Sequence, residues 1–320
     1  PTLSAKEIVG NESQERMGIV IREEDIEHIR QIADRERAPF YVVGETTGDH
    51  RFVFEQTDGV KPIDLAMEDM FGKAPRTVMT DRTVEETYED VTYDQTQLDE
   101  YVERVLQLEA VACKDWLTNK VDRSVTGKIA RQQCQGEIQL PLSDCGVVAL
   151  DYRGRAGIAT SIGHAPQAAL VDPAAGSVLS IAEALTNIVW APLSEGLDSV
   201  SLSANWMWPC KNEGEDARLY RAVEACSDFA CSLGINIPTG KDSLSMTQKY
   251  GKDKVYSPGT VIISAGAEVS DIRKVVSPVL RTGVDSMVYY IDFSFDKLKL
   301  GGSAFAQSLD KIGKEVPTVQ

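Results

Sequence analysis

The sequence has few histidines and no closely spaced pair of cysteines. Its 320 residues include only His28, His50 and His164, and the six cysteines form no Cys-x-x-Cys motif. Structural zinc sites usually combine cysteines and histidines, and nucleophilic triads need a histidine beside a serine or cysteine. These sites are therefore disfavoured, and we expect the cysteines to be reduced and structural.

Basic residues are also scarce. Lys and Arg number 33 against 49 Asp and Glu, which gives a net charge of −16. Phosphate backbones and acidic membranes repel such a surface, so nucleic-acid and membrane partners are disfavoured. No apolar run approaches the ~18 residues of a membrane span, and the first residues lack the basic and apolar stretches of a leader. We therefore expect a cytoplasmic protein.

The length of the chain predicts two or three folding units, at roughly 100 to 200 residues each. The chain begins at Pro1 rather than at a methionine, and it stops soon after a predicted strand and helix near its C-terminus. We therefore expect a piece of a longer polypeptide.

Hydrophobic periodicity in the first 60 residues predicts the tail of an α+β domain. The elements are strands at 17–22, 40–44 and 51–54 and a helix at 24–37. Order weakens from 61 to 96, and residues 81–103 hold nine acids and one base, Arg82. This composition predicts a solvated connector, and a docking site for a basic partner is the alternative.

A second domain starts with a predicted helix at 97–112. Alternating and continuous apolar runs predict strands at 146–151, 157–162, 168–172, 199–205, 235–239 and 260–269. Helices at 173–191 and 215–233 lie between them, each long enough to cover one face of a sheet. A third segment follows from 271, with a strand at 286–293 and a helix from 303.

Three oxygen donors suggest a site for a hard cation. Glu183 and Asn187 are four residues apart on a predicted helix, so they share one face. Asp144 follows an extended run at 138–142. Mg²⁺ bound by a few carboxylates commonly adds nucleotide phosphates, so these side chains would suit a nucleotide site if the fold brought them together. An exposed hydrogen-bonded pair is the alternative for Glu183 and Asn187.

Three further segments carry polar groups suited to ligands. Residues 239–243 (Thr-Gly-Lys-Asp-Ser) follow a short apolar strand, but their spacing is not that of a P-loop. Backbone N–H groups and Lys241 could still hold a phosphate there, and a plain exposed turn is the alternative. Residues 122–127 are similarly ambiguous, with Arg123 suited to an anion. Residues 12–17 precede the first strand and are either a ligand loop or a solvated one.

Taken together, several blocks resemble the synthetase portion of the phosphoribosylformylglycinamidine synthase family in its large single-chain form. They are Glu-Ser-Gln-Glu-Arg at 12–16, Arg-Glu-Arg-Ala-Pro at 35–39, Asp-Arg-Ser-Val-Thr-Gly at 122–127, Glu-Ala-Leu-Thr-Asn at 183–187, Leu-Ser-Ala-Asn-Trp-Met at 202–207, Gly-Glu-Asp-Ala at 214–217 and Gly-Lys-Asp-Ser at 240–243. They span nearly the whole chain in the family's order.

The resemblance implies an α/β and α+β fold made of aminoimidazole-ribonucleotide-synthetase-like units. Residues 1–60 would end the C-terminal α+β domain of a first unit, and 61–96 would be an acidic connector. Residues 97–268 would form the N-terminal α/β nucleotide-binding domain of a second unit. Residues 269–320 would begin its C-terminal domain.

The resemblance also implies a reaction. In the family, ATP activates the amide oxygen of formylglycinamide ribonucleotide, and ammonia from a glutaminase domain displaces phosphate to give the amidine. The expected cofactors are Mg²⁺ and ATP or ADP. The expected partners are the small-molecule substrate, the nucleotide and the rest of the same polypeptide, including its glutaminase domain.

Site residues follow from the resemblance position by position. Asp144, Glu183 and Asn187 resemble Mg²⁺ ligands of an auxiliary nucleotide site. The expected nucleotide contacts are Ser143, Ser203, Gly240 and Lys241, and the expected substrate contacts are Glu12, Ser13, Gln14 and Ser243. Lys241 replaces the asparagine of a related Gly-Asn-Val-Ser loop, which favours phosphate contact over metal binding.

Several parts of the family's machinery have no counterpart in this sequence. These are the glycine-rich nucleotide loop of the first unit, the last Mg²⁺ aspartate of the second, and the glutaminase Cys and His. No catalytic residue is therefore assigned, and the chain alone is predicted to be inactive as a synthase. The alternatives are another ATP-binding member of the superfamily, such as a small-molecule kinase or a selenophosphate-synthetase-like enzyme, or a non-catalytic scaffold.

Overall fold

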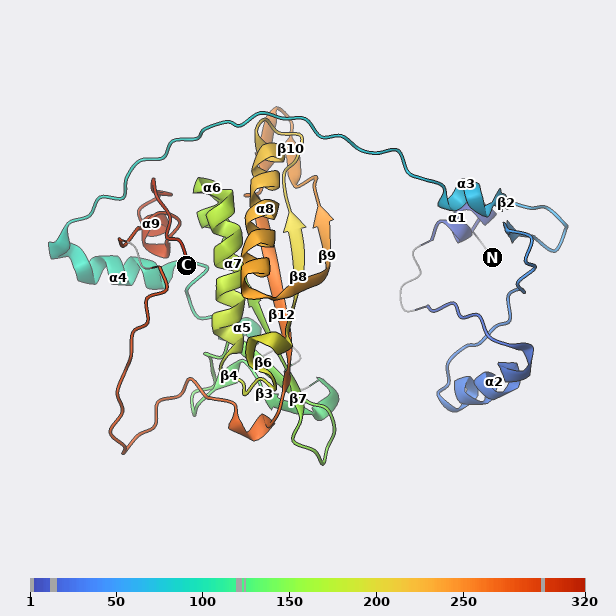
Figure 1. The fold of residues 1–320 in the computed structure, drawn as a ribbon, viewed down its shortest axis with the longest axis horizontal. Coiled ribbons are helices and arrows are strands. Elements are labelled where there is room, and N and C mark those ends of the chain that lie inside the picture. Colours follow the sequence, from blue (N-terminus) through green and yellow to red (C-terminus); the bar gives the residue numbers. More distant parts are fainter. Residues whose placement is uncertain (1–2, 12–15, 119–122, 124, 295–296, 320) are drawn as a thin grey trace. The chain divides into compact units, whose positions relative to one another are not determined.

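The computed structural model describes residues 3–11, 16–118, 123, 125–294 and 297–319. The chain divides into two units, Pro1–Val78 and Met79–Gln320, which are coloured along the sequence in Figure 1. The boundary lies inside the segment 61–96 that the sequence predicts to be a connector.

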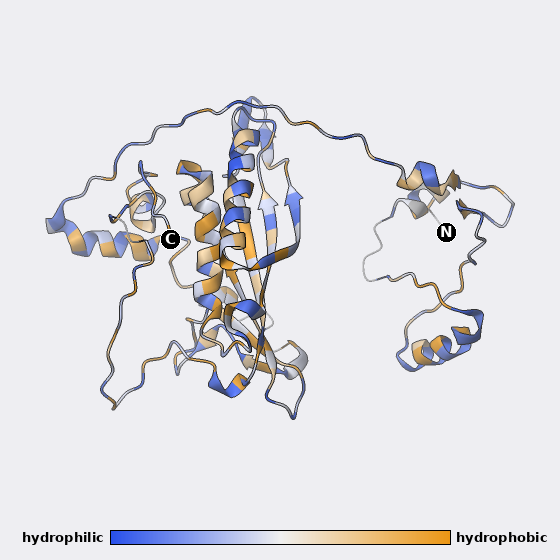
Figure 2. Ribbon diagram, viewed as in Figure 1, coloured by the Kyte–Doolittle hydropathy of each residue, from blue (hydrophilic) through white to orange (hydrophobic). Residues whose placement is uncertain are grey.

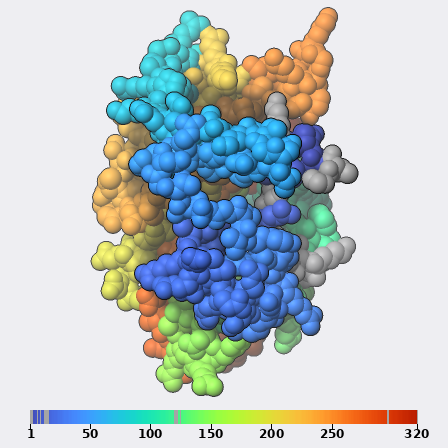
Figure 3. Space-filling view, turned by 90° about the vertical axis from the view of Figure 1, so that its right-hand side faces the viewer, coloured from blue at the N-terminus to red at the C-terminus, as the bar shows by residue number. Residues whose placement is uncertain are grey.

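The first unit has short elements and little internal packing. Strands β1 (Arg51–Phe54) and β2 (Ile63–Ala66) form an antiparallel pair. The helices are α1 (Ala5–Val9), α2 (Ile26–Arg35) and α3 (Met67–Phe71). No residue of this unit whose burial the structure describes is buried, and the unit forms the blue surface in Figure 3. The described side chains therefore form no buried core in this unit. Without one, an isolated two-stranded hairpin is only marginally stable in water.

Two strands predicted in the first unit are wrong. Residues 17–22 and 40–44 have no strand structure, although their apolar residues suit one. A strand needs a neighbour to accept its backbone hydrogen bonds, and none of the described segments pairs with either run. The predicted strand at 51–54 is confirmed as β1, and its partner β2 lies where the sequence predicts a connector.

The second unit is built on a six-stranded sheet with the order β3-β6-β7-β12-β8-β9. The strands are β3 (Ile129–Arg131), β6 (Cys145–Ala149), β7 (Gly157–Gly163), β8 (Val200–Met207), β9 (Asn236–Ser243) and β12 (Thr260–Val269). Neighbours are antiparallel except β8 and β9, which are parallel because a long helix crosses between them.

Two long helices cover one face of this sheet (Figure 1). Helix α7 (Pro173–Ile188) packs on β7 and β12, and α8 (Glu215–Leu233) packs beside α7. In β7 buried and exposed residues alternate strictly, since successive side chains point to opposite faces. Ala159 of β7 belongs to the main core with Ile181 and Ile188 of α7, and Figure 2 shows α7 as the more apolar of the two helices.

The predicted strand at 168–172 is wrong, because those residues belong to helix α6 (Pro166–Val171). A short apolar run does not by itself distinguish a strand from a buried helix. Pro166 occupies the first turn, where its missing N–H costs nothing, and Ala168 and Ala169 are buried on the helix. Asp172 then caps α7 by accepting hydrogen bonds from the N–H groups of Ala174 and Ala175.

Smaller elements complete the second unit. They are α4 (Leu98–Gln107), α5 (Asp115–Thr118), α9 (Ala304–Ser308) and the hairpins β4 (Cys134–Gln135) with β5 (Leu140–Pro141) and β10 (Thr247–Tyr250) with β11 (Asp253–Tyr256). The predicted strand at 286–293 is wrong, since these residues are exposed and carry no strand structure. No described strand pairs with this run, so its apolar side chains are not part of a sheet.

Candidate functional site

The sheet register brings several of the predicted site segments to one end of the sheet. A row of paired residues crosses four strands at Gly163, Ile263, Ala204 and Gly240. Cys145 of β6 pairs with Ser161, so Asp144 directly precedes the strand at the same end. Strands β7, β8 and β9 run in the same direction, and their carboxyl ends therefore lie together.

Glu183 and Asn187 both reach the carboxyl end of β7. A Glu183 carboxylate oxygen accepts a hydrogen bond from the backbone N–H of His164 at 2.6 Å, and His164 Nδ1 lies 3.7 Å from it. Asn187 Nδ2 donates to the Ile162 carbonyl at 3.1 Å, which leaves its Oδ1 free to accept. The two side chains thus share one helix face, and each bonds to the strand.

Helix α7 can approach β7 this closely because of one glycine. A Cβ on Gly163 would collide with the Ser180 carbonyl oxygen and lie 2.5 Å from the Ala184 nitrogen, both backbone atoms of α7. Beside it, Ser161 Oγ donates to the Ala184 carbonyl at 2.6 Å. These contacts fix the height of Glu183 and Asn187 above the strand end.

Ser143 and Asp144 directly precede β6, the strand next to β7 in the sheet. The Ser143 N–H donates to the Gln133 carbonyl at 3.0 Å, and its hydroxyl donates to the Cys145 carbonyl at 3.1 Å. The Asp144 carboxylate is exposed and has no ion pair or hydrogen bond within the described residues. It is therefore available to a ligand.

Residues 240–243 lie in strand β9 rather than in a loop. Gly240 pairs with Ala204, and a Cβ there would collide with the Ala204 carbonyl oxygen. Because β8 and β9 pair along this segment, its backbone cannot wrap a phosphate as a loop would. Lys241 is exposed and its Nζ lies 3.2 Å from Ser243 Oγ.

Strand β12 separates Ser203 of β8 from the predicted metal ligands, and β12 and β8 together separate Gly240 and Lys241 of β9 from them, whereas Ser143 directly precedes Asp144. Ser203 and Gly240 lie on β8 and β9, whereas Asp144, Glu183 and Asn187 gather around β6 and β7, with β12 between. At about 4.8 Å per strand, β7 and β9 are roughly 14 Å apart. One metal ion cannot contact both groups, although an extended ligand could span them.

A cavity of about 380 Å³ adjoins Glu183. Its walls include His164 and Gln167 together with residues from the C-terminal segment, namely Lys299, Gly301, Gly302 and Ser303. Gly302 has φ +68°, and a Cβ on it would lie 2.8 Å from the Ala168 backbone. None of these residues is predicted from the sequence as a site residue, and the signal that could have indicated them is the Gly301-Gly302 pair before a helix.

Some predicted residues lie outside the described part of the chain. Glu12, Ser13 and Gln14 are among them, as are Asp122 and Ser124 of the 122–127 block. Among the described residues, no three His, Cys, Asp or Glu side chains come together as a metal-binding group. A cation beside Asp144 would therefore also use an amide oxygen, water or a phosphate. No helix in the described ranges is both long and apolar enough to cross a membrane.

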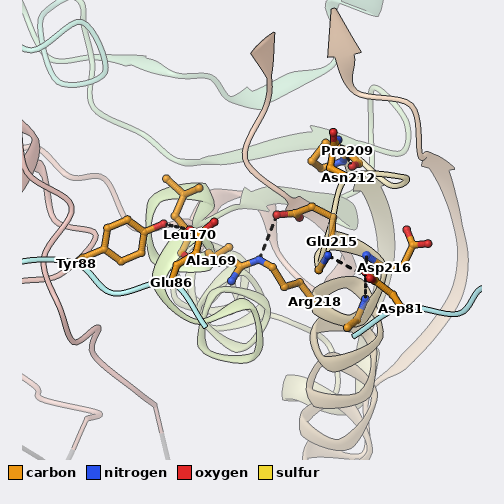
Figure 4. Close-up of polar contacts among 12 residues, drawn as sticks. Asp81, Glu86, Tyr88, Ala169, Leu170, Pro209, Asn212, Glu215, Asp216 and Arg218 are labelled. Atoms are coloured by element: carbon orange, nitrogen blue, oxygen red, sulfur yellow. Dashed lines mark hydrogen bonds and ion pairs between the residues drawn. The ribbon is translucent and has the colours of Figure 1, made fainter. Parts of the chain in front are cut away.

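The acidic segment after Val78 contacts other parts of the second unit through hydrogen bonds, an ion pair and aromatic rings, and Figure 4 shows some of these contacts. The Asp81 carboxylate accepts hydrogen bonds from the N–H groups of Gly214, Asp216 and Ala217 at 3.0 to 3.3 Å, at the start of α8. Arg82 pairs with Glu213. Tyr93 and Tyr101 place their rings against Phe305, with centroids 5.8 and 5.2 Å away. The predicted connector is thus mostly exposed but anchored.

Replacing Asp81 by Asn is expected to lower Tm by about 2 °C at neutral pH, because a carboxylate at a helix N-terminus stabilises it. The N–H of Arg82, with those of α8, holds the pKa of Asp81 below its ordinary value. Its contribution is therefore present above the ordinary pKa and lost as pH falls through the lowered one. Thermal melts across pH 2 to 7 test this. Asp90→Asn, at an exposed acid of the same segment, should change nothing, and equal melts for both variants would contradict the cap.

Comparisons with known proteins agree with this fold. A family model described as the FGAR-AT PurM_N-like domain matches residues 113–268. The chain is similar to phosphoribosylformylglycinamidine synthase from Dictyostelium discoideum, with 37% identity over 99% of this chain and 24% of the relative. The Homo sapiens protein is 38% identical over 99% of this chain and 25% of its own length. The chain thus spans about a quarter of these curated relatives.

Solved structures show the same architecture. Thermotoga maritima PurL complexed with ADP matches with a TM-score of 0.61 and 17% identity, covering 87% of this chain and 42% of that one. The same protein complexed with ATP gives a TM-score of 0.59 at 16% identity, over 87% and 41% of the two chains. The predicted fold class, with a PurM-N-like domain on a mixed sheet, is confirmed.

Proposed function

The chain is homologous over its whole length to about a quarter of phosphoribosylformylglycinamidine synthase, and from this we propose that it supplies part of an ATP-dependent ligase. The proposed reaction converts formylglycinamide ribonucleotide, glutamine-derived ammonia and ATP to the amidine, ADP and phosphate. Within that enzyme, this chain would form a nucleotide site at the carboxyl ends of β7, β8 and β9. The observation that supports it is that Glu183 and Asn187 bond to the carboxyl end of β7, beside the start of β6, which Asp144 directly precedes.

These donors fit Mg²⁺. They offer an unpaired carboxylate on Asp144, the remaining lone pairs of Glu183 and the amide oxygen of Asn187, and all are oxygens, the ligands Mg²⁺ prefers. When bound, the ion would offset the charge of the nucleotide phosphates. The missing third carboxylate suits an ion that keeps water and phosphate oxygens among its ligands.

The remaining predicted contacts would serve the nucleotide and the substrate. Ser143 before β6 and Ser203 on β8 would contact the nucleotide from positions that β7 and β12 separate. Gly240 lets strand β9 approach β8, and the Lys241 ammonium would meet a phosphate as a point charge. Ser243 would meet the substrate together with Glu12, Ser13 and Gln14.

We propose that the rest of the synthase polypeptide, including a glutaminase domain, is needed for activity. The first unit has no buried residue among those whose burial the structure describes, and the sheet face away from the helices exposes apolar side chains of Val148, Ile158 and Ile162. Both surfaces are of the kind that further domains bury. The chain alone should therefore bind nucleotide but produce no amidine.

Binding of Mg²⁺-ADP should raise the Tm of this chain. A ligand that binds only the folded state adds about 2.7 kcal/mol at a hundred times its Kd. Asp144→Asn and Glu183→Gln should each abolish most of the shift, since each removes an anionic oxygen from the ion. Thermal melts over a nucleotide titration, with and without Mg²⁺, measure it.

Glu268→Gln is the matched control, because this exposed glutamate lies at the opposite end of the sheet, paired with Ile158. It should leave the shift unchanged. The proposal fails if wild-type protein shows no Mg²⁺-ADP shift at millimolar nucleotide, or if Glu268→Gln reduces the shift as much as Asp144→Asn does.

A further inference from the structure

A second cavity lies at the other edge of the same domain, where β3 passes into the β4–β5 hairpin. Its volume is about 300 Å³, and its lining includes Arg131, Gln132, Gln135, Gly136 and Gln139. The lining residues comprise one cation, three glutamines and no carboxylate. In a chain with a net charge of −16, an uncompensated cation in a cavity is unexpected.

The Arg131 guanidinium has only neutral partners. One terminal nitrogen donates to Gln135 Oε1 at 2.6 Å and the other to the Val275 carbonyl at 3.0 Å. Its Nε is buried without a hydrogen-bond partner, and Arg131 forms no ion pair within the described ranges. Removing a charge from water without a counter-charge is costly, so an arrangement that adds an anion would be favoured.

The glutamines around Arg131 can complete such a site. Gln135 is 8% exposed and holds Arg131 in place, while Gln132 Oε1 is buried without a partner. An amide that turns over presents two N–H donors in place of its oxygen. The cavity therefore combines a guanidinium with amide donors, which is the chemistry that holds a phosphate or similar oxyanion.

A strained turn also lines the cavity. Gln139 has φ +57° and Gly136 has φ +72°, and Gln139 Nε2 donates to the Gly136 carbonyl at 2.8 Å. A left-handed backbone at a residue other than glycine costs free energy and tends to persist at ligand sites. This turn lines the cavity together with the residues of β3.

We propose that this cavity binds a phosphate-type oxyanion through Arg131 and the amides of Gln132 and Gln139. The carbonyl of Gln133, which lies between the lining residues Gln132 and Cys134, accepts from the Ser143 N–H, so the cavity is linked through the backbone to the start of β6 beside Asp144. The inference does not depend on the proposed nucleotide site, because none of its ligands is shared with that site.

The test is titration of the full chain with inorganic phosphate in a chloride background. Isothermal titration calorimetry and the broadening of the ³¹P line measure the binding. Arg131→Gln should weaken binding at least about tenfold, since hydrogen bonds to charged groups contribute roughly 1.5–3 kcal/mol. Arg131→Lys should retain more of the affinity than Arg131→Gln, because it keeps the charge. Equal affinity in wild type and Arg131→Gln would overturn the proposal, as would no phosphate binding by wild type.

Arg153→Gln is the matched control, since it removes one exposed arginine of the same domain, and it should bind phosphate as wild type does. If Arg131→Gln does not fold, as judged by near-UV circular dichroism, Gln132→Leu decides the question. This near-isosteric change removes an amide whose oxygen has no partner, and it should weaken phosphate severalfold. Unchanged affinity in Gln132→Leu would then overturn the proposal.

Two further measurements distinguish phosphate binding in this cavity from binding at the nucleotide site and identify the source of the anion. Asp144→Asn should keep phosphate binding and lose the Mg²⁺-ADP shift, whereas Arg131→Gln should do the reverse if the anion is free phosphate. Competition by Mg²⁺-free ADP against bound phosphate would instead assign the cavity to a nucleotide phosphoryl group. Equal loss of phosphate binding in Asp144→Asn and Arg131→Gln would overturn a separate cavity site.

Discussion

Replacing Gly163 by Ala is expected to destabilise the second unit by about 3 kcal/mol or more, near the upper limit of overpacking effects. The new methyl group would meet backbone atoms of Ser180 and Ala184, which cannot turn aside as a side chain can. Helix α7 must then move away from β7, and the Ser161 hydrogen bond to the Ala184 carbonyl must lengthen. Urea unfolding followed by circular dichroism measures the loss.

The matched control for this substitution is Gly266→Ala. Gly266 lies on β12, the strand next to β7, and its Cβ would meet no heavy atom within 4 Å. That variant should unfold within about 0.5 kcal/mol of wild type, as surface substitutions commonly do. Gly163→Ala should also reduce any rise in Tm caused by Mg²⁺-ADP, because Glu183 belongs to the displaced helix α7. Similar stability in the two variants would show that α7 approaches β7 less closely than described.

The sheet and its covering helices could be predicted because their signals are local. Asp172 before Pro173 is a helix start, and it caps α7 where the sequence predicts a helix. Gly234 in the left-handed region ends α8 at the predicted residue. The strand predicted at 157–162 is present as β7, from Gly157 to Gly163.

The wrong predictions fall on segments whose secondary structure depends on a neighbouring helix or strand of the same chain. Residues 168–172 and 286–293 have similar apolar runs, yet the first is helix α6 and the second forms no element. Pro166 and the burial of Ala168 against α7 select a helix in the first case. The second run has no strand beside it in the described chain, so its strand propensity has no hydrogen-bonding partner.

The candidate site was only partly predictable for a related reason. The i,i+4 spacing of Glu183 and Asn187 fixes their common face, and this follows from helix geometry alone. The sheet order does not follow from spacing, so the separation of Gly240 from Asp144 by intervening strands could not be foreseen. The cavity beside Glu183 also needs Gly302, more than a hundred residues away, to lie against α6.

Arg218→Met is expected to destabilise the protein by about 3–5 kcal/mol at neutral pH, since it leaves a buried carboxylate without its cation. Arg218 Nε lies 3.5 Å from Glu215, and both side chains are only 12% exposed. Its Nη2 also donates to the carbonyls of Ala169 and Leu170, which joins α8 to the end of α6 (Figure 4). Methionine keeps most of the apolar stem, so the loss reports the charge and its hydrogen bonds.

The pH dependence of this loss separates an uncompensated charge from lost packing. Burial raises the pKa of Glu215 above its ordinary value, and Arg218 opposes that rise. A carboxyl with a raised folded-state pKa stabilises the fold while protonated, and that contribution is lost as pH rises through the raised pKa. Without Arg218 the pKa rises further, so the deficit should be larger at about pH 7 than at about pH 5. A deficit that does not change with pH would indicate packing alone.

Arg221→Met is the matched control one turn along α8. Arg221 lies 3.7 Å from Asp172, and its side chain is 46% exposed. Exposed pairs contribute about 0–1 kcal/mol, so this variant should stay close to wild type. Adding Glu215→Gln to Arg218→Met should recover part of the stability at neutral pH, because no buried carboxylate then remains. Equal losses for Arg218→Met and Arg221→Met would contradict a buried ion pair. Recovery only in the double variant would identify Glu215 as the group that makes Arg218 necessary.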